Sequence, residues 1–260
     1  MKPSPRSHVV ASRIVAGLAV GGLLLAVPGA AFAAGSTPTS GGSGGSGSGS
    51  ASHPTCTPAN FASAQTAVET QLTDRVTQLN KLVANVNGTE GQYLTAADKA
   101  TLLSDLTGTE LPGIQALQAK VPTDTTCPAL VADAKSMVET YRVYMVMTPQ
   151  ADLTIVADTE SAIITKVQST YPTITAAIAA AQAQGKDVSG AQAAFTDLQA
   201  QVSAASTAVS GVSATVLAQT PAGAPGNKTV FDGAHTSVKT AHTDLTNAHT
   251  DITTIVNDLK

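Results

Sequence analysis

Apolar residues recur every three or four positions through most of the chain, from Phe61 to Leu259. This spacing fits one face of an α-helix, because residues three and four apart lie on the same side of it. The periodicity is longest in two stretches. Their apolar residues are Phe195, Leu198, Val202, Ala205, Val209, Val212 and Val216, and then Phe231, Ala234, Val238, Ala241, Leu245, Ala248, Ile252, Ile255 and Leu259. Such heptads are typical of a coiled-coil seam. The pattern predicts an all-α fold, an elongated bundle of about six helices that ends in a heptad-patterned hairpin.

Glycine, proline and a capping threonine mark the expected helix ends. The first four helices are expected at about 58–87, 95–121, 128–147 and 149–184. Thr95 fits an N-cap, Gly108 and Pro112 predict a kink, Pro172 predicts a bend, and Gly185 closes the fourth helix. The last two helices flank a loop rich in proline and glycine, which predicts an antiparallel hairpin. Because two helices bury little alone, the second half of the fourth helix is their expected third partner.

The first 33 residues have the layout of a secretory signal peptide. Lys2, Arg6 and Arg13 precede the apolar run Ile14–Val27, and Ala31 and Ala33 place small residues where a signal peptidase cleaves. The run is too short for an ordinary transmembrane helix, which needs about 20 apolar residues. We therefore expect export and a mature chain that begins at Ala34.

The rest of the chain divides into three predicted parts. Residues 34–55 form a disordered tether, since the stretch from Ser40 to Ser50 contains only glycine and serine. Residues 56–185 form a four-helix bundle. Residues 186–260 form an antiparallel coiled-coil-like hairpin that packs on the fourth helix.

Charge and composition narrow the classes of partner. The net charge is −4, and loss of the three basic residues of the signal peptide takes it to −7. A mildly acidic chain lacks the clustered lysine and arginine that nucleic acids and anionic membranes require. No later segment has a run of 18 apolar residues, so no stable membrane insertion is expected after cleavage.

The chain has two cysteines, Cys56 and Cys127. In an exported protein, such a pair predicts a disulfide, and the alternative is two free buried thiols. In an up–down bundle, the helix after Cys127 starts beside the start of the helix after Cys56. The predicted topology therefore brings the two residues together.

The densest chemical feature is the segment from Glu139 to Gln150. We predict a chain reversal near Pro149, and antiparallel pairing would then place Arg142 beside Asp158 as a structural ion pair. The alternative is a small ligand pocket lined by four large side chains of this segment: Tyr141, Tyr144, Met145 and Met147.

Four short motifs resemble an uncharacterised group of secreted bacterial helical proteins. They are Leu94-Thr95-Ala96-Ala97-Asp98-Lys99, Tyr141-Arg142-Val143-Tyr144, Pro149-Gln150 and Ala157-Asp158. The resemblance covers about residues 58–170 and implies export and a helical fold. It implies no activity.

A heptad repeat places His235, His242 and His249 at one helical position. Seven residues rise about 10.5 Å along a helix, whereas zinc–nitrogen bonds are about 2 Å, so two of these histidines cannot share an ion. We expect the solvated flank of a coiled coil and no metal or other cofactor. Association that depends on pH is a second possibility, since histidine titrates near neutral pH.

The sequence contains no recognisable catalytic motif, and we predict no catalytic residues and no enzyme. The best functional hypothesis is a secreted helical protein of the bacterial surface or surroundings, a spacer or interaction module. Its partner would be an unidentified protein or cell-envelope component. In the second case, the secreted protein would be associated with the cell wall. The alternative is a ligand- or metal-binding secreted protein that uses either the Tyr141/Arg142/Tyr144 cluster or the histidine flank.

Overall fold

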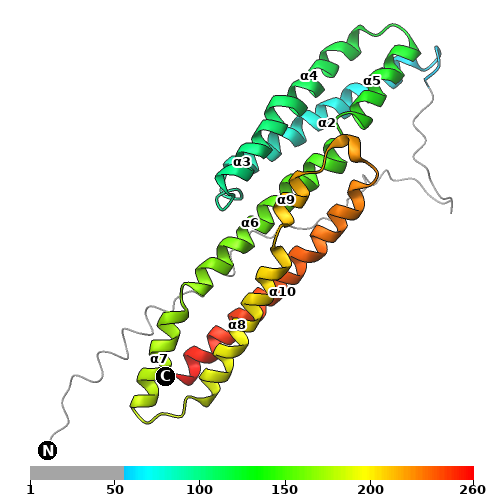
Figure 1. Cartoon of the computed structure of the whole chain (residues 1–260). Coiled ribbons are helices and arrows are strands. Elements are labelled where there is room, and N and C mark those ends of the chain that lie inside the picture. The colour runs from blue at the N-terminus through cyan, green and yellow to red at the C-terminus, as the bar shows by residue number, and fades with distance from the viewer. Residues whose placement is uncertain (1–55) are drawn as a thin grey trace, which may run out of the picture. The chain divides into compact units, whose positions relative to one another are not determined.

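The structure, a computed structural model, describes residues 56–260. The predicted signal peptide and tether lie outside these residues. The described part is helical throughout and contains no strand, so the prediction of an all-α fold is confirmed. Its α-helices are α2 (Phe61–Asn87), α3 (Ala96–Leu103), α4 (Leu111–Lys120), α5 (Cys127–Glu139), α6 (Thr148–Gln168), α7 (Tyr171–Ala183), α8 (Ser189–Val209), α9 (Val212–Leu217) and α10 (Asn227–Asp258) (Figure 1).

Breaks divide two of the expected helices near the predicted positions. The expected kink near Gly108 is a π-helical turn, Ser104–Glu110, between α3 and α4. The expected bend at Pro172 separates α6 from α7, and Gly185, with φ +76°, follows the end of α7. Thr95 caps α3 as predicted, because its side chain accepts a hydrogen bond from the Asp98 backbone N–H at 3.1 Å.

The described residues form two compact units. The N-terminal unit comprises residues 56–152 and 217–228, and the C-terminal unit comprises residues 153–216 and 229–260. This division falls within α6 and therefore differs from the predicted boundary between residues 185 and 186. None of the described helices is both long and apolar enough to cross a membrane.

In the N-terminal unit, α2 packs against α4 and α5. The predicted disulfide between Cys56 and Cys127 is present, with 5.5 Å between the two Cα atoms. It joins the start of α5 to the segment that leads into α2, as the up–down arrangement of the first three helices requires. The core of the unit includes the following buried residues: Leu72, Leu79, Leu82, Val86, Leu102, Leu106, Ile114, Val121, Leu130, Met137 and Val146.

The chain reversal predicted near Pro149 is wrong. The chain instead breaks at Arg142, whose φ is +40°, and then continues along α2 in the direction of α5. Three contacts show that α2 and the chain from α5 to the start of α6 run in the same direction. Ala64 and Leu130 line one cavity. Further along, Arg75 lies 5.2 Å from the centroid of the Tyr144 ring, and Gln78 Nε2 donates to Thr148 Oγ1 at 3.2 Å. Pro149 sits in the first turn of α6, where proline is compatible with a helix.

The turn between α2 and α3 requires a glycine at position 91. A Cβ atom there would lie 2.3 Å from the Val86 carbonyl oxygen, and a backbone atom cannot easily move away. We expect Gly91→Ala to lower the free energy of unfolding by about 2 kcal/mol or more in urea denaturation. Gly108→Ala is the matched control, because a Cβ atom there meets nothing within 4 Å. Equal effects of the two substitutions would contradict this account of the turn.

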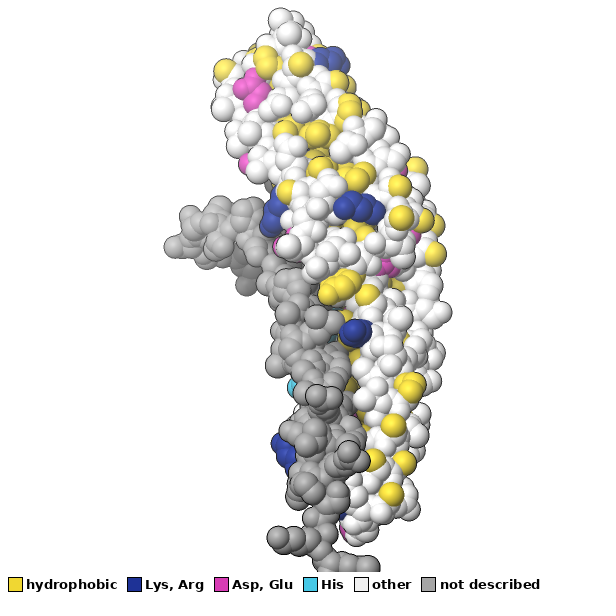
Figure 2. Space-filling view, turned by 90° about the vertical axis from the view of Figure 1, so that its left-hand side faces the viewer, with side chains coloured by type: hydrophobic (Ala, Val, Ile, Leu, Met, Phe, Trp, Pro, Cys, Tyr) yellow, Lys and Arg dark blue, Asp and Glu magenta, His cyan; other side chains and the backbone are white. Residues whose placement is uncertain are grey.

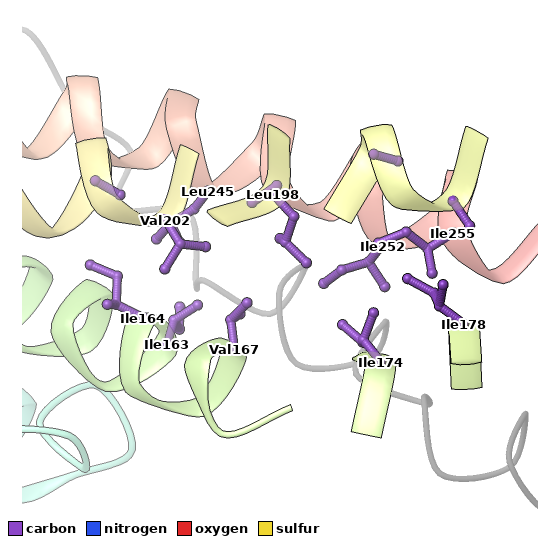
Figure 3. Close-up of a cluster of buried hydrophobic side chains, with 14 of the residues drawn as sticks. Ile163, Ile164, Val167, Ile174, Ile178, Leu198, Val202, Leu245, Ile252 and Ile255 are labelled. Atoms are coloured by element: carbon purple, nitrogen blue, oxygen red, sulfur yellow. The ribbon is translucent and has the colours of Figure 1, made fainter. Parts of the chain in front are cut away.

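The C-terminal unit has one hydrophobic core, to which α6, α7, α8 and α10 all contribute (Figure 3). Ile163 and Val167 of α6 lie against Leu198 and Val202 of α8 and Leu245 of α10. Burial along α10 follows steps of three and four: Phe231, Ala234, Val238, Ala241, Leu245, Ala248, Ile252 and Ile255. Helices α8 and α10 run antiparallel, since Lys186 Nζ, just before α8, donates to the carbonyl oxygens of Leu259 and Lys260 (Figure 1).

Candidate functional site

A groove of about 300 Å³ lies between α2 and α5 in the N-terminal unit. Its lining is mostly small or aliphatic: Cys56, Ala64, Ala67, Val68, Gln71, Leu130, Val131, Ala134, Lys135, Met137, Val138 and Glu139. Alanines on both helices leave this space, because their side chains are too short to fill the gap between two helices. A concave, largely apolar site with a few polar groups at its edge is the usual form of a binding site.

One rim of the groove carries a charged pair on α5. Lys135 Nζ lies 3.7 Å from Glu139 Oε2, and both side chains are more than half exposed. Such an exposed pair contributes little to stability, so both groups remain available to a partner. Val131, one turn before Lys135, is 52% exposed.

An arginine and a tyrosine adjoin the far end of the groove. The Arg75 guanidinium lies 5.2 Å from the centroid of the Tyr144 ring, a cation–π contact, and it donates to the Gln71 carbonyl oxygen at 3.0 Å. Partial burial raises the pKa of the Tyr144 hydroxyl and lowers the pKa of Arg75. Tyr144 is nevertheless 48% exposed, so one part of its ring remains open to solvent.

The four residues predicted to line a ligand pocket do not line this groove. Met147 is buried in the core, whereas Met145 is 52% exposed and lies 4.0 Å from Arg142 Nη1. The Tyr141 ring covers Gly113 of α4, where a Cβ atom would approach it to 2.1 Å. Only Tyr144 lies next to the groove, through its contact with Arg75. The groove therefore lies at residues of α5 that precede the predicted cluster.

Arg142 and Asp158 each have a different partner from the one predicted. Arg142 Nε donates to the Glu139 carbonyl oxygen at 3.1 Å, and Asp158 Oδ1 accepts from the Ser213 hydroxyl at 2.7 Å. The two residues belong to different units, and the ion pair between them stays a prediction. The reversal from which it was inferred does not occur.

The histidine flank of α10 faces α6 at one point. His242 Nδ1 lies 3.7 Å from Oε1 of Glu160, which is 1% exposed. Burial raises the pKa of Glu160 to about 8. His249 Nδ1 is also buried, and no hydrogen-bond partner for it is found among the described residues. This flank is thus less solvated than expected. Within residues 56–260, no three histidine, cysteine or acidic side chains are placed to hold a metal ion.

Two buried carboxyl groups of the N-terminal unit were also missed by the sequence reasoning. Burial, together with the nearby charge of Asp105, raises the pKa of Glu110 to about 7. Asp133 is 4% exposed and accepts from Lys120 Nζ at 2.6 Å. Their spacing in the sequence could have revealed such groups, because each acid lies three or four positions from apolar residues of the same helical face.

Gln150, from the Pro149-Gln150 motif, has a structural role. Its side chain is almost fully buried, and Nε2 donates to the carbonyl oxygens of Leu217 at 3.0 Å and Gln219 at 3.1 Å. Leu217 is the last residue of α9, where backbone acceptors lack partners within the helix, and Gln219 lies just after it. The motif residue therefore caps another segment.

Comparison of the chain with models of protein families, with curated proteins and with solved structures gives no match. The groove between α2 and α5 is therefore judged by its own geometry. It offers apolar surface, the charged pair Lys135–Glu139 and the nearby Tyr144 ring, and these groups are suited to binding a partner or ligand.

Proposed function

We propose that the protein is an exported, non-catalytic helical module that binds another protein through the α2–α5 groove. The observation that carries this proposal is that the groove has an exposed apolar side chain, Val131, in its lining and the exposed Tyr144 ring near one end. Among the described residues, the large hydrophobic side chains that are most exposed are Val131, Tyr144 and Met145, and all three lie within or just after α5. Exposed apolar side chains beside a concave surface are typical of an interaction site.

The disulfide supports export. Disulfides persist in oxidising compartments and are rare in the cytosol. Cys56 and Cys127 close a loop with a sequence separation of 71 at one end of the bundle, so the bond holds the two walls of the groove together. Both thiols are consumed in it, and neither is available as a nucleophile.

The surface also favours contacts that do not depend on strong charge. On the face shown in Figure 2, charged side chains are few and scattered. Only 12% of the residues of the chain are charged. A protein partner that offers apolar side chains suits such a surface better than a polyanion does.

We further propose that α8 and α10 pair through a coiled-coil seam and act as a spacer. The alternation of three and four residues between buried positions of α10 supports this, because it keeps one apolar stripe on the inner face. The expected six-helix arrangement, with each divided helix counted once, belongs to the same proposal.

A small apolar ligand is a second candidate occupant of the groove. Its volume of about 300 Å³ lies at the lower end of the range for small-molecule sites. Such a ligand would bind in the α2–α5 groove and not in the pocket predicted at Tyr141 and Tyr144.

Native mass spectrometry of protein recovered from culture medium tests the groove. We expect a complex for the natural chain and its loss in Val131→Arg, because a buried arginine without a partner is strongly unfavourable. Lys239→Glu, an exposed change on α10, is the control and should leave the complex intact. Identical spectra for the natural chain and Val131→Arg would contradict binding through the groove.

A further inference from the structure

We propose that the α2–α5 groove binds a medium-chain fatty acid, with about ten carbons of its chain in the groove and its carboxylate at Arg75. The inference rests on the proposed function, because it gives the chemistry of the small ligand named there as the second candidate. It is carried by the dimensions of the groove, by the order of apolar and polar groups along it, and by a cation at one end.

The length and the volume of the groove agree on one chain length. Its lining on α5 extends from Leu130 to Glu139, a rise of about 13.5 Å along the helix. An extended hydrocarbon chain advances about 1.3 Å per carbon, because its bonds are about 1.5 Å long, so about ten carbons span this length. The volume of about 300 Å³ holds the same number, if each CH2 group takes about as much room as one water of the liquid, about 30 Å³. The groove thus has the dimensions of one unbranched chain.

The polar groups of the lining gather at one end of the groove. On α2, the only polar lining residue is Gln71, which is also the last one; on α5, Lys135 and Glu139 belong to the second half of the lining. Because α2 and α5 run in the same direction, these halves meet at the same end, beside Arg75 and Tyr144. The other end, where the disulfide lies, is lined by alanine and aliphatic side chains. This order fits an amphiphile with its head at Arg75 and its tail toward the disulfide.

Arg75 places a cation at the polar end. Its Nη1 donates to the carbonyl oxygen of the lining residue Gln71 at 3.0 Å, so the guanidinium lies at the edge of the groove. Among the described residues, no carboxylate lies within ion-pair distance of this group, although Asp74 is near enough to favour its charge. A guanidinium has five N–H donors in a fork that matches a carboxylate, and the bond to Gln71 leaves donors for one. A partly buried cation without a carboxylate partner is favourable for binding an anionic head.

The other charges at this end leave a positive excess. Lys135 and Glu139 pair at 3.7 Å and cancel each other. Arg142, whose Nε donates to the Glu139 carbonyl oxygen, adds a second guanidinium near Arg75. Three cations therefore stand against two acids, Asp74 and Glu139, which leaves a local charge of +1 in a chain whose net charge is −4. A neutral or cationic head would gain nothing from this excess.

Isothermal titration calorimetry with decanoate, below the concentration at which it forms micelles, tests the head and the tail separately. We expect one decanoate per disulfide-bonded chain, and at least about tenfold weaker binding of decanol, which has the same tail and a neutral head. Arg75→Gln should lower the affinity for decanoate to that for decanol and leave decanol binding unchanged. Unchanged binding of decanol also shows that this variant is folded.

Filling the hollow tests the tail. Ala134→Leu and Ala67→Leu, one on each wall, should each weaken the binding of both probes about tenfold or more, because the added side chain occupies the space of the hydrocarbon. Lys239→Glu on α10 is the control and should leave both affinities unchanged. In a series of fatty acids from six carbons upward, we expect the affinity to rise about fourfold per CH2 group until about ten carbons and then to level off.

Three results would overturn the inference: no binding of decanoate, equal affinities for decanoate and decanol, or an affinity for decanoate that resists both Arg75→Gln and Ala134→Leu. The last result would mean adventitious binding of the probe elsewhere. If decanoate fails to bind but a Val131-dependent complex with another protein forms, the inference fails and the proposed protein-binding function stands. If neither forms, both fail.

Discussion

Replacing Cys56 and Cys127 together by serine is expected to lower the free energy of unfolding of the N-terminal unit by about 4 kcal/mol. The reason is the length of the closed loop, since the two cysteines are separated by 71 positions in the sequence. Without the bond, the unfolded chain gains the conformational freedom that this loop removes. Both residues are only partly buried, so the serine hydroxyls remain accessible to water.

Urea denaturation followed by circular dichroism measures this loss. A reducing agent provides the matched control, because it should destabilise the natural chain to the same extent and leave the double serine variant unchanged. A loss below about 1 kcal/mol would contradict a structural role for the bond, since native disulfides of small exported domains contribute at least about 2 kcal/mol.

The second large effect concerns Glu160. Burial raises the pKa of this carboxyl from 4.5 to about 8 in the folded chain. Below pH 4.5 it is protonated in both the folded and the unfolded chain. As the pH rises from there to 8, the unfolded chain loses this proton while the folded chain keeps it, so stability falls. A tenfold difference in proton affinity corresponds to about 1.4 kcal/mol, so the total loss reaches about 3–5 kcal/mol by pH 8 and does not grow above it.

Glu160→Gln removes this titration and should flatten the dependence of stability on pH. Urea denaturation at a series of pH values between 4.5 and 9 checks the expectation. Glu90→Gln is the matched control, because Glu90 is exposed and the same chemical change there should leave the profile unaltered. A variant that loses stability toward pH 8 as steeply as the natural chain would show that Glu160 is charged in the folded state.

The helical class and most helix ends were predictable because they depend on local chemistry. The cap at Thr95 and the end of α7 near Gly185 follow from hydrogen bonding and backbone freedom within a few residues. The disulfide was predictable because the first three helices alternate in direction. Each of these features is determined by nearby residues or by simple topology.

The direction of the chain after α5 was not predictable. Proline in the first turn of a helix is equally compatible with a reversal and with a continuation, so Pro149 does not distinguish them. The actual break lies at Arg142, whose positive φ is uncommon for a residue other than glycine. No local pattern indicated it.

Buried acids were missed because the apolar stripe was judged by its apolar members alone. On α6, Glu160 stands between Ala157 and Ile164 at steps of three and four. Asp133 stands in the same way between Leu130 and Met137 on α5. An acid at a stripe position indicates either burial or a break in the stripe, and three-dimensional packing decides which.

The groove between α2 and α5 was not predicted, for a related reason. Large side chains such as Tyr141 and Met147 attract attention as ligand contacts, but they pack against their own bundle. The groove is formed by alanines, which the sequence shows only as ordinary members of helical stripes. A hollow depends on how two helices are placed, and this placement is not a property of either helix alone.

Export is the claim on which the functional account depends most. Expression of the full sequence in a bacterium, followed by denaturing mass spectrometry of protein from the medium, tests it most directly. We predict a chain from Ala34 to Lys260 that is lighter by two hydrogens than its reduced form, because Cys56 and Cys127 are joined. A protein that stays inside the cell, keeps Met1 or the residues next to it, and carries two free thiols would contradict the account.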